Sequence, residues 1–166
     1  MLIAAGAQGY ALTQRDAQPV SVGDVFPDVL LAPLFDGEPA QSTHDLRGKV
    51  AIVDLWVSWC TPCKREIPEL SKVYEDYRDR GATVLGVNRE PRNRTAARKT
   101  WTELAPSFRS VVVRDAGRRS GLGETLGGES LPTTYVLDRD GVVSHVHIGY
   151  TAPDDFRSEL DSLLAE

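Results

Sequence analysis

The stretch VAIVDLWVSWCTPCK, residues 50–64, decides the fold of this chain of 166 residues. Residues 50–57 form a nearly continuous apolar run, which is typical of a strand buried on both faces of a parallel sheet. Residues 61–80 follow with apolar side chains at helical spacing, and they predict a helix. Cys60 and Cys63, the two cysteines of the chain, lie where this strand gives way to this helix.

Alternating strand and helix patterns continue on both sides of this stretch. They predict strands over 82–88, 111–114, 133–137 and 142–148, and helices over 94–104, 118–126 and 154–164. An apolar run over 26–34, followed by a turn signal at 35–38, predicts an N-terminal β-hairpin extension. This order predicts an α/β sandwich of three layers, with a central, mostly parallel sheet, an antiparallel C-terminal hairpin and helices on both faces.

Composition indicates one globular domain, which we place at residues 25–166. The chain is 41% hydrophobic and 26% charged, and no apolar run approaches the ~18 residues of a membrane span. Its net charge of −5 argues against nucleic acid as a partner, because phosphate binding needs a basic face. Residues 1–24 are predicted to be a flexible N-terminal segment or the remnant of an export signal, since they open with the apolar sequence MLIAAGA.

The two thiols differ in their predicted surroundings. Cys60 occupies the N-cap of the predicted helix, where free backbone N–H groups and the positive end of the helix dipole stabilise a thiolate. Cys63 lies one turn further along and is expected to be more buried. Cys60 is therefore predicted to attack a target disulfide, after which Cys63 attacks Cys60 and releases the reduced target. Pro62 fits the first turn, because that position needs no N–H donor.

Two other interpretations of the cysteine pair compete with redox chemistry. A zinc or copper site would add a histidine to the pair, but zinc usually takes four Cys or His ligands, and the chain has only His44, His145 and His147 to add. A purely structural disulfide between positions i and i+3 closes almost no loop and adds little stability. We therefore expect a redox-active pair that needs no metal and no dissociable cofactor.

Residues 54–64, DLWVSWCTPCK, resemble the active-site stretch of the thioredoxin superfamily. Pro68 matches the proline that kinks the active-site helix of that superfamily. The sequence LPTT at 131–134 matches its cis-proline loop. The resemblance implies a thioredoxin-like fold and spans most of the chain.

Within the superfamily, the closer likeness is to the TlpA/ResA branch of thiol–disulfide oxidoreductases. The segment before Val50 resembles the N-terminal extension of that branch. Glu66 occupies the position of its characteristic acidic residue. The 69 residues from Cys63 to Pro132 leave room for an inserted strand–helix unit.

Two acidic residues near the cysteines are candidates for proton transfer. Glu66 lies one turn after Cys63 on the same helix face, within reach of the thiols. Asp54 lies in the apolar strand, where burial raises the pKa of a carboxyl group and makes it a plausible proton acceptor for Cys63. The alternatives are a solvated helix acid for Glu66 and a hydrogen-bonded core carboxylate for Asp54, a position at which many members of the branch carry asparagine.

The cis-proline loop and the residues around Cys60 are predicted to hold the substrate. If the bond before Pro132 is cis, as the resemblance implies, Leu131 can offer its backbone N–H and C=O to an extended target segment. The other residues expected to contact the target are Trp59, Thr61, Pro62 and Thr133.

The resemblance implies a protein-disulfide oxidoreductase that acts as a reductant outside the bacterial cytoplasm, in the periplasm or tethered to the membrane in a longer precursor. A cytoplasmic location remains open. The implied partners are a membrane thiol electron donor and disulfide-containing targets such as apocytochrome c during cytochrome c maturation, and we expect a monomer. A peroxiredoxin-like peroxidase is the alternative function, because the N-terminal region also resembles redoxin domains, although the Pro-x-x-x-Thr-x-x-Cys context of such enzymes is missing around Cys60.

Overall fold

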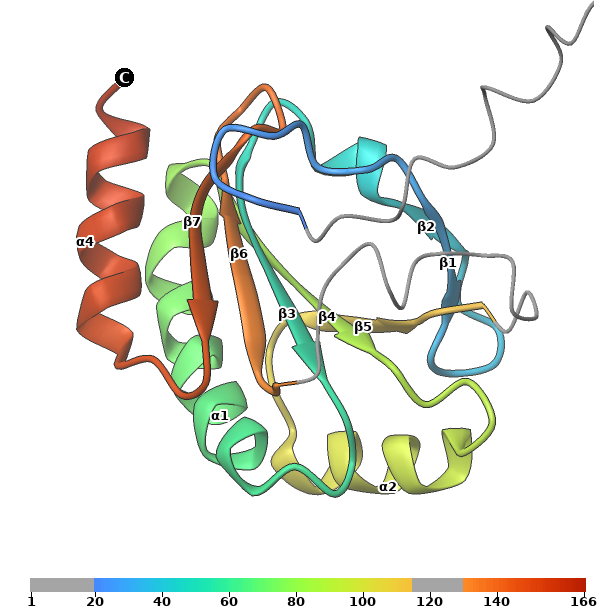
Figure 1. Ribbon diagram of the computed structural model, residues 1–166. Helices are drawn as coiled ribbons and strands as arrows, with labels where there is room; N and C mark the ends of the chain where they lie inside the picture. The colour runs from blue at the N-terminus through green and yellow to red at the C-terminus, as the bar shows by residue number, and fades with distance from the viewer. Residues whose placement is uncertain (1–19, 115–129) are drawn as a thin grey trace, which may run out of the picture.

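The computed structural model describes residues 20–114 and 130–166, which form a seven-stranded sheet flanked by α helices (Figure 1). The strands lie in the order β2-β1-β5-β4-β3-β6-β7 across the sheet. They span Leu30–Pro33 (β1), Gln41–Ser42 (β2), Val50–Trp56 (β3), Ala82–Asn88 (β4), Arg109–Val112 (β5), Thr133–Leu137 (β6) and Val143–Ile148 (β7). The helices span Thr61–Tyr77 (α1), Arg94–Leu104 (α2) and Pro153–Leu164 (α4), with 3-10 helices at Thr43–Leu46 (η1) and Arg78–Arg80 (η2). The helix predicted at 118–126 lies outside the described residues.

The sheet is mixed, where the sequence predicted a mostly parallel one. β3 pairs parallel with β4, and β4 with β5, whereas the other four pairings are antiparallel. The parallel pairs are those joined through α1 and α2, because a helical crossover returns the chain to the edge where it started. β6 starts beside the end of β3, with Thr133 opposite Leu55, and therefore runs back antiparallel to it.

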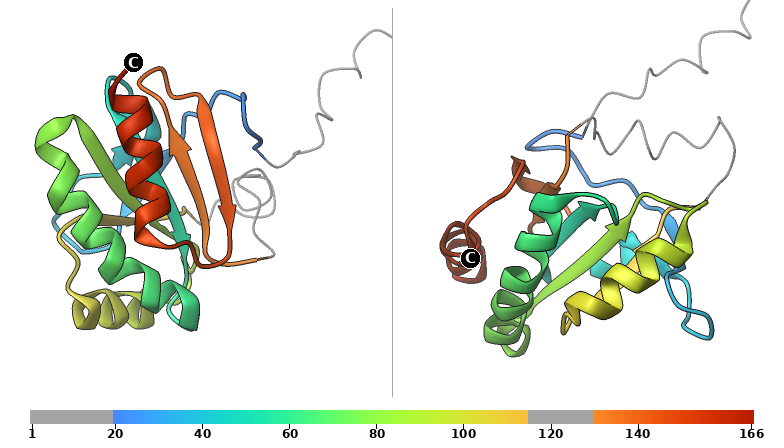
Figure 2. Two further views of the ribbon diagram at one scale, coloured as in Figure 1. Left: turned by 90° about the vertical axis from the view of Figure 1, so that its left-hand side faces the viewer. Right: turned by 90° about the horizontal axis from the view of Figure 1, so that it is seen from below.

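The three α helices of the described residues lie on one face of the sheet, as the right-hand view of Figure 2 shows. Ile67 of α1, Trp101 of α2 and Phe156 of α4 join one core cluster with Ile52 of β3. The shared face follows from the topology. The steps from β3 to β4 and from β4 to β5 go in the same direction across the sheet, and right-handed crossovers then place both helices on the same side.

The opposite face of the sheet is covered by the N-terminal segment in the described part of the chain. Val20, Phe26 and Leu46 pack there against a second cluster that includes Val53 of β3 and Tyr135 of β6. The predicted layer of helices on this face is thus replaced, among the described residues, by extended chain and η1. No helix in these two ranges is long and apolar enough to cross a membrane.

Residues 20–24 belong to the folded unit, although the sequence placed them in the flexible segment before residue 25. The Gly23 N–H donates to the Val143 carbonyl at 2.8 Å, and the Val143 N–H donates to the Asp24 carbonyl at 2.9 Å. Val20 is buried as well. Residues 20–24 therefore lie along β7, and they hold in place the extended chain that covers the second core cluster.

Only four residues separate α1 from β3, because the chain gives the helix a cap and a suitable first turn. Cys60 is the N-cap in an extended conformation, and Pro62 lies in the first turn. The buried side chains of the helix form a stripe at mostly three- and four-residue spacing: Cys63, Glu66, Ile67, Leu70, Ser71, Val73 and Tyr77. This stripe anchors the helix on the sheet, and it holds Cys63 and Glu66 on the inner side.

Candidate active site

Cys60 and Cys63 form a disulfide at the N-terminus of α1, with 5.3 Å between their Cα atoms. The Cys63 backbone N–H donates to the Cys60 Sγ at 3.2 Å. Both cysteines are buried, Cys63 fully and Cys60 with 4% of its surface exposed. Cys60 is thus at the N-cap, where the sequence placed it, and after reduction the same N–H and the helix dipole would be the groups to stabilise a thiolate.

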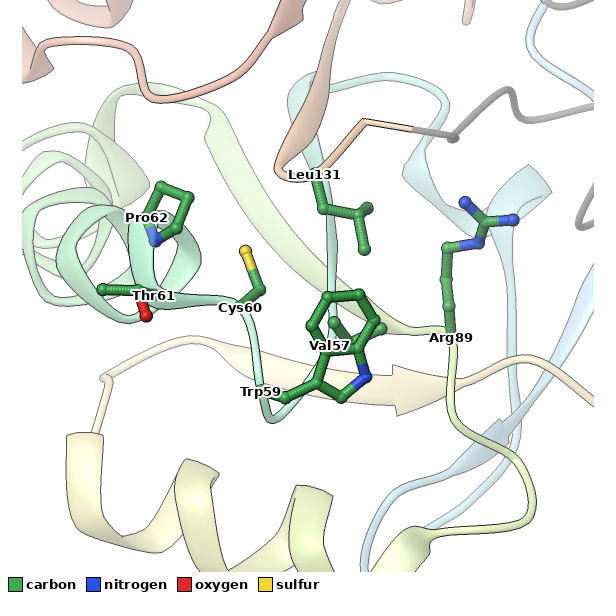
Figure 3. Close-up of a pocket in the computed structure, with 7 residues that line it drawn as sticks. All are labelled: Val57, Trp59, Cys60, Thr61, Pro62, Arg89 and Leu131. Carbon is green, nitrogen blue, oxygen red and sulfur yellow. The ribbon is translucent and has the colours of Figure 1, made fainter.

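A pocket of about 400 Å³ opens beside Cys60 (Figure 3). Its lining comprises Val57, Trp59, Cys60, Thr61, Pro62, Arg89 and Leu131. Trp59 is 73% exposed, which is unusual for a residue of this size and puts an apolar ring at the rim. The structure therefore brings four of the residues predicted to hold the substrate around the sulfur of Cys60. Val57 and Arg89 join them without having been predicted.

The Leu131–Pro132 peptide bond is cis, and Leu131 faces the pocket opposite Cys60 (Figure 3). The Pro132 carbonyl accepts a hydrogen bond from the Gly149 N–H at 2.8 Å, which ties the loop to the end of β7. Thr133, also predicted to contact the substrate, is buried and donates to the Ser130 carbonyl at 2.7 Å. Its side chain shapes the loop and lies outside the pocket lining.

Asp54 and Glu66 are both fully buried, and Thr134 of β6 lies between them. The Thr134 Oγ1 is 3.4 Å from the Asp54 Oδ1 and 3.1 Å from the Glu66 Oε1. Glu66 also accepts a hydrogen bond from the Thr151 N–H at 2.6 Å. The alternative interpretation of Glu66 as a solvated helix acid is therefore wrong, since its side chain is fully buried.

Burial raises the pKa of both carboxyl groups. The pKa of Asp54 lies well above its usual value because of burial and, second, the nearby charge of Glu66. Burial also raises the pKa of Glu66 to about 7, while the hydrogen bonds from Thr151 and Thr134 and the proximity of His147 act in the opposite direction. A carboxyl group with a pKa near neutrality can both accept and return a proton under ordinary conditions.

Glu90, in the loop after β4, holds the chain just before the nucleophile. Its carboxylate accepts hydrogen bonds from the Ser58 backbone N–H and, at 2.9 Å, from the Ser58 hydroxyl. Buried Asn88 supports it, since the Asn88 Oδ1 accepts from the Glu90 N–H at 2.8 Å and the Asn88 Nδ2 lies 3.4 Å from the Glu90 Oε2. Glu90 therefore fixes the loop between β3 and α1.

Sequence reasoning missed Glu90 and Thr134 for a common reason, which is that their partners lie far away in the sequence. Glu90 acts on a residue 32 positions away, and Thr134 bridges two acids 80 and 68 positions away. One signal was present for Thr134, because it belongs to the LPTT loop that faces the cysteines. None marked Glu90, which follows a buried strand in an ordinary charged loop.

The alternative of a metal site needs a set of ligands around the cysteines. In residues 20–114 and 130–166, no group of three or more His, Cys, Asp or Glu side chains is arranged to hold an ion. His147 instead pairs with Glu159 at 3.0 Å, and its ring meets Phe156 edge-on.

Comparison with known proteins identifies relatives along nearly the whole chain. A model of the AhpC/TSA family matches residues 22–146. The thiol-disulfide oxidoreductase ResA of Geobacillus thermodenitrificans is 30% identical over 164 residues, which cover 98% of this chain and 90% of ResA. The thiol:disulfide interchange protein DsbE of Pseudomonas aeruginosa is 30% identical over 156 residues, covering 94% and 82% of the two chains.

The fold is likewise found among solved structures. A thiol:disulfide interchange protein of the thioredoxin family from Chlorobium tepidum superposes with a TM-score of 0.70 at 26% identity. The match covers 90% of this chain and 99% of that protein. The predicted thioredoxin-like α/β fold is confirmed.

Proposed function

The chain belongs to the AhpC/TSA family and is a TlpA/ResA-like thiol–disulfide oxidoreductase of the thioredoxin superfamily, and from this premise we propose that it reduces disulfides in target proteins. The observation that supports this proposal is the position of the Cys60–Cys63 disulfide. It lies at a helix N-terminus and beside an open pocket whose far wall is the cis-proline loop.

In the proposed cycle, the Cys60 thiolate attacks one sulfur of the target disulfide. A bond forms between Cys60 and the target, and the other target sulfur leaves as a thiolate that takes up a proton. Cys63 then loses its proton to a nearby carboxyl group, and its thiolate attacks the Cys60 sulfur. The bond to the target breaks, the second target sulfur leaves as a thiolate that also takes up a proton, and the protein holds the disulfide seen in the structure.

The pocket lining supports binding of an extended target segment. Leu131 would offer its backbone to the target on one side of Cys60, while exposed Trp59, Thr61 and Pro62 would contact the target on the other. The proposed setting is outside the cytoplasm, with a membrane thiol carrier as electron donor and apocytochrome c among the targets. The TlpA/ResA resemblance and the relatives named ResA and DsbE support this setting.

The experiment that tests the direction of electron flow is equilibration of the protein with dithiothreitol or glutathione redox buffers. We expect a reduction potential below about −250 mV, and reduction both of insulin and of an oxidised Cys-x-x-Cys-His peptide. Cys60→Ser should abolish both reactions. A potential near about −120 mV would instead make the protein an oxidant and overturn the proposed direction.

One alternative is favoured by a specific finding. The AhpC/TSA model matches residues 22–146, which include the region that resembles redoxin domains. A peroxiredoxin-like peroxidase would use the Cys60 thiolate to cleave the peroxide O–O bond and, with Cys63, end as disulfide, alcohol and water. The reduced protein should therefore be mixed with hydrogen peroxide. Our proposal expects peroxide consumption no faster than with an ordinary free cysteine.

A further inference from the structure

Thr134 occupies a position that links three elements of the active site. In the sheet register, Thr134 lies opposite Asp54 of β3 on one side and opposite His147 of β7 on the other. Its hydroxyl also reaches Glu66 on α1, which packs above these strands. The side chain is fully buried, so its hydrogen bonds are made with protein groups.

The hydrogen-bond inventory of this group allows few arrangements. A threonine hydroxyl carries one hydrogen, so Thr134 can donate to Asp54 or to Glu66 but not to both at once. Glu66 has a second donor in the Thr151 N–H. Asp54 has none besides Thr134 among the described residues, and its Oδ2 is buried without a hydrogen-bond partner there.

Two arrangements of one shared proton satisfy the Thr134 hydroxyl. In one, Asp54 carries the proton and donates to the Thr134 oxygen, and the Thr134 hydroxyl donates to an ionised Glu66. In the other, the two acids exchange roles. The first is favoured, because an ionised Glu66 keeps the Thr151 N–H as a second donor, whereas an ionised Asp54 would have no donor but Thr134 among the described residues. With both acids ionised, one buried charge would face only another oxygen atom, which is costly away from water. Of the charges on the surrounding elements, one supports this assignment and one opposes it. His147 of β7 favours the ionised form of Glu66, whereas Glu69 of α1 opposes it.

We propose that Thr134 is a positioning residue that joins Asp54 and Glu66 into one proton-sharing unit, in which its hydroxyl accepts from Asp54 and donates to Glu66. This inference deepens the proposed function and rests on it. It assigns different tasks to the two acids. Asp54 carries the proton while the disulfide is closed, and Glu66 is ionised and can accept a second proton.

The unit gives the resolving step a place for its proton. When Cys63 closes onto Cys60, the Cys63 thiol gives up one proton, the bond between Cys60 and the target breaks, and the target sulfur leaves as a thiolate. The unit takes that proton and then holds two, one on each acid. Release of one proton to solvent returns it to the state with one. No electrons pass through the acids, because the two electrons go from the Cys60 and Cys63 sulfurs to the target disulfide.

The direct test is a carboxyl 13C NMR titration of the oxidised protein, with Thr134→Val compared with Thr134→Ser. Thr134→Val removes the hydroxyl at nearly constant shape, and Thr134→Ser keeps it. In Thr134→Val, we expect the titration midpoint of Glu66 to rise by about one pH unit, because its ionised form loses a donor. The midpoint of Asp54 should stay or fall, because its protonated form loses an acceptor. Thr134→Ser should titrate like the unaltered protein.

A rise in the midpoint of Asp54 in Thr134→Val would show that the hydroxyl donates to Asp54, and it would overturn the proposal. Unchanged midpoints for both acids would overturn it as well, and would leave Thr134 as a packing residue. If Thr134→Val does not fold, Asp54→Asn serves instead, because asparagine imitates the protonated acid. Glu66 should then keep its midpoint, and a fall would show that Asp54 had carried a charge.

This titration separates the inference from the proposed function. It is carried out on the disulfide form and needs neither turnover nor a target protein. The proposed reductase can therefore fail in the redox buffers while the proton-sharing unit is confirmed, and the reverse can also occur.

Discussion

Glu66 is the residue whose burial has the clearest consequence for stability. Its pKa rises from 4.5 to about 7 on folding, so between these pH values the folded protein binds more protons than the unfolded chain. Stability therefore falls as the pH rises through this window, and the loss is on the order of 3 kcal/mol. Asp54, whose pKa is raised as well, contributes to the slope in the same direction in both proteins. Glu66→Gln keeps the shape of the protonated acid and should remove the part of the slope that Glu66 contributes, so that it is more stable than the unaltered protein at pH 8.

The measurement is urea unfolding of the disulfide form at several values between pH 4 and pH 8. Glu103→Gln is the control, because it removes a carboxylate from an exposed position on α2. A Glu66→Gln variant with the same slope as the control would contradict the assignment of this pH dependence to Glu66.

The sequence identified individual residues where their chemistry depends on near neighbours. The roles predicted for Cys60 and Cys63 rest on their place between a strand and a helix, which the apolar run before them and the helical spacing after them indicate. Glu66 was recognised as a candidate, but its burial was not, because a group that contacts it belongs to Thr151, 85 positions away. Helical periodicity predicts on which face of the helix a residue lies, but it does not predict which distant segment packs against that face.

The loop between β3 and α1 makes a prediction at the scale of elements. Glu90 accepts from both the backbone and the hydroxyl of Ser58, two residues before the nucleophile. Glu90→Ala leaves the buried Ser58 donors without this acceptor and should lower the free energy of unfolding by about 1–3 kcal/mol. Because the loop then no longer holds Cys60 in place, insulin reduction should slow several-fold.

Rates of insulin reduction and urea unfolding curves check this, with Glu103→Ala as the matched control on α2. Glu90→Gln should fall between the two, because an amide keeps one acceptor oxygen. If Glu90→Ala reduces insulin as fast as Glu103→Ala does, the loop does not depend on this contact.

The elements themselves were predictable where burial imposes a simple pattern. The bounds of β4, α2 and β6 agree with the sequence prediction, because β4 and β6 are apolar runs with clear ends and α2 has a helical pattern. Their arrangement was harder to obtain. The direction of β6 depends on the end of the sheet at which the chain enters it. That α1 and α2 lie on the same face of the sheet depends on the order of the strands. Neither property is encoded in the periodicity of one segment.

At the scale of the whole molecule, the sheet separates two cores that are covered by different kinds of structure. Helices cover the core that contains Cys63 and Trp56, whereas extended chain from residue 20 onward covers the other. Trp56 of β3 links the sheet to α2, since its ring stacks on that of Trp101 with 5.0 Å between the ring centroids. Its Nε1–H also donates to the Ser110 hydroxyl of β5 at 3.0 Å. Among the described residues, no α helix covers the second core. The stability of its cover therefore depends on the few large side chains that the extended chain places there.

Phe26 is the main such side chain, and it provides the last prediction. It is buried and meets Tyr135 of β6 edge-on, with 5.3 Å between the ring centroids. Phe26→Ala should lower the free energy of unfolding by about 3–5 kcal/mol, because it removes this contact and leaves a cavity. Val25→Ala, at a position that is 58% exposed, should change the same quantity by less than about 0.5 kcal/mol. Urea unfolding of both variants measures the difference. Equal effects at the two positions would show that the N-terminal segment does not seal this core, and that the sheet is stable without its cover.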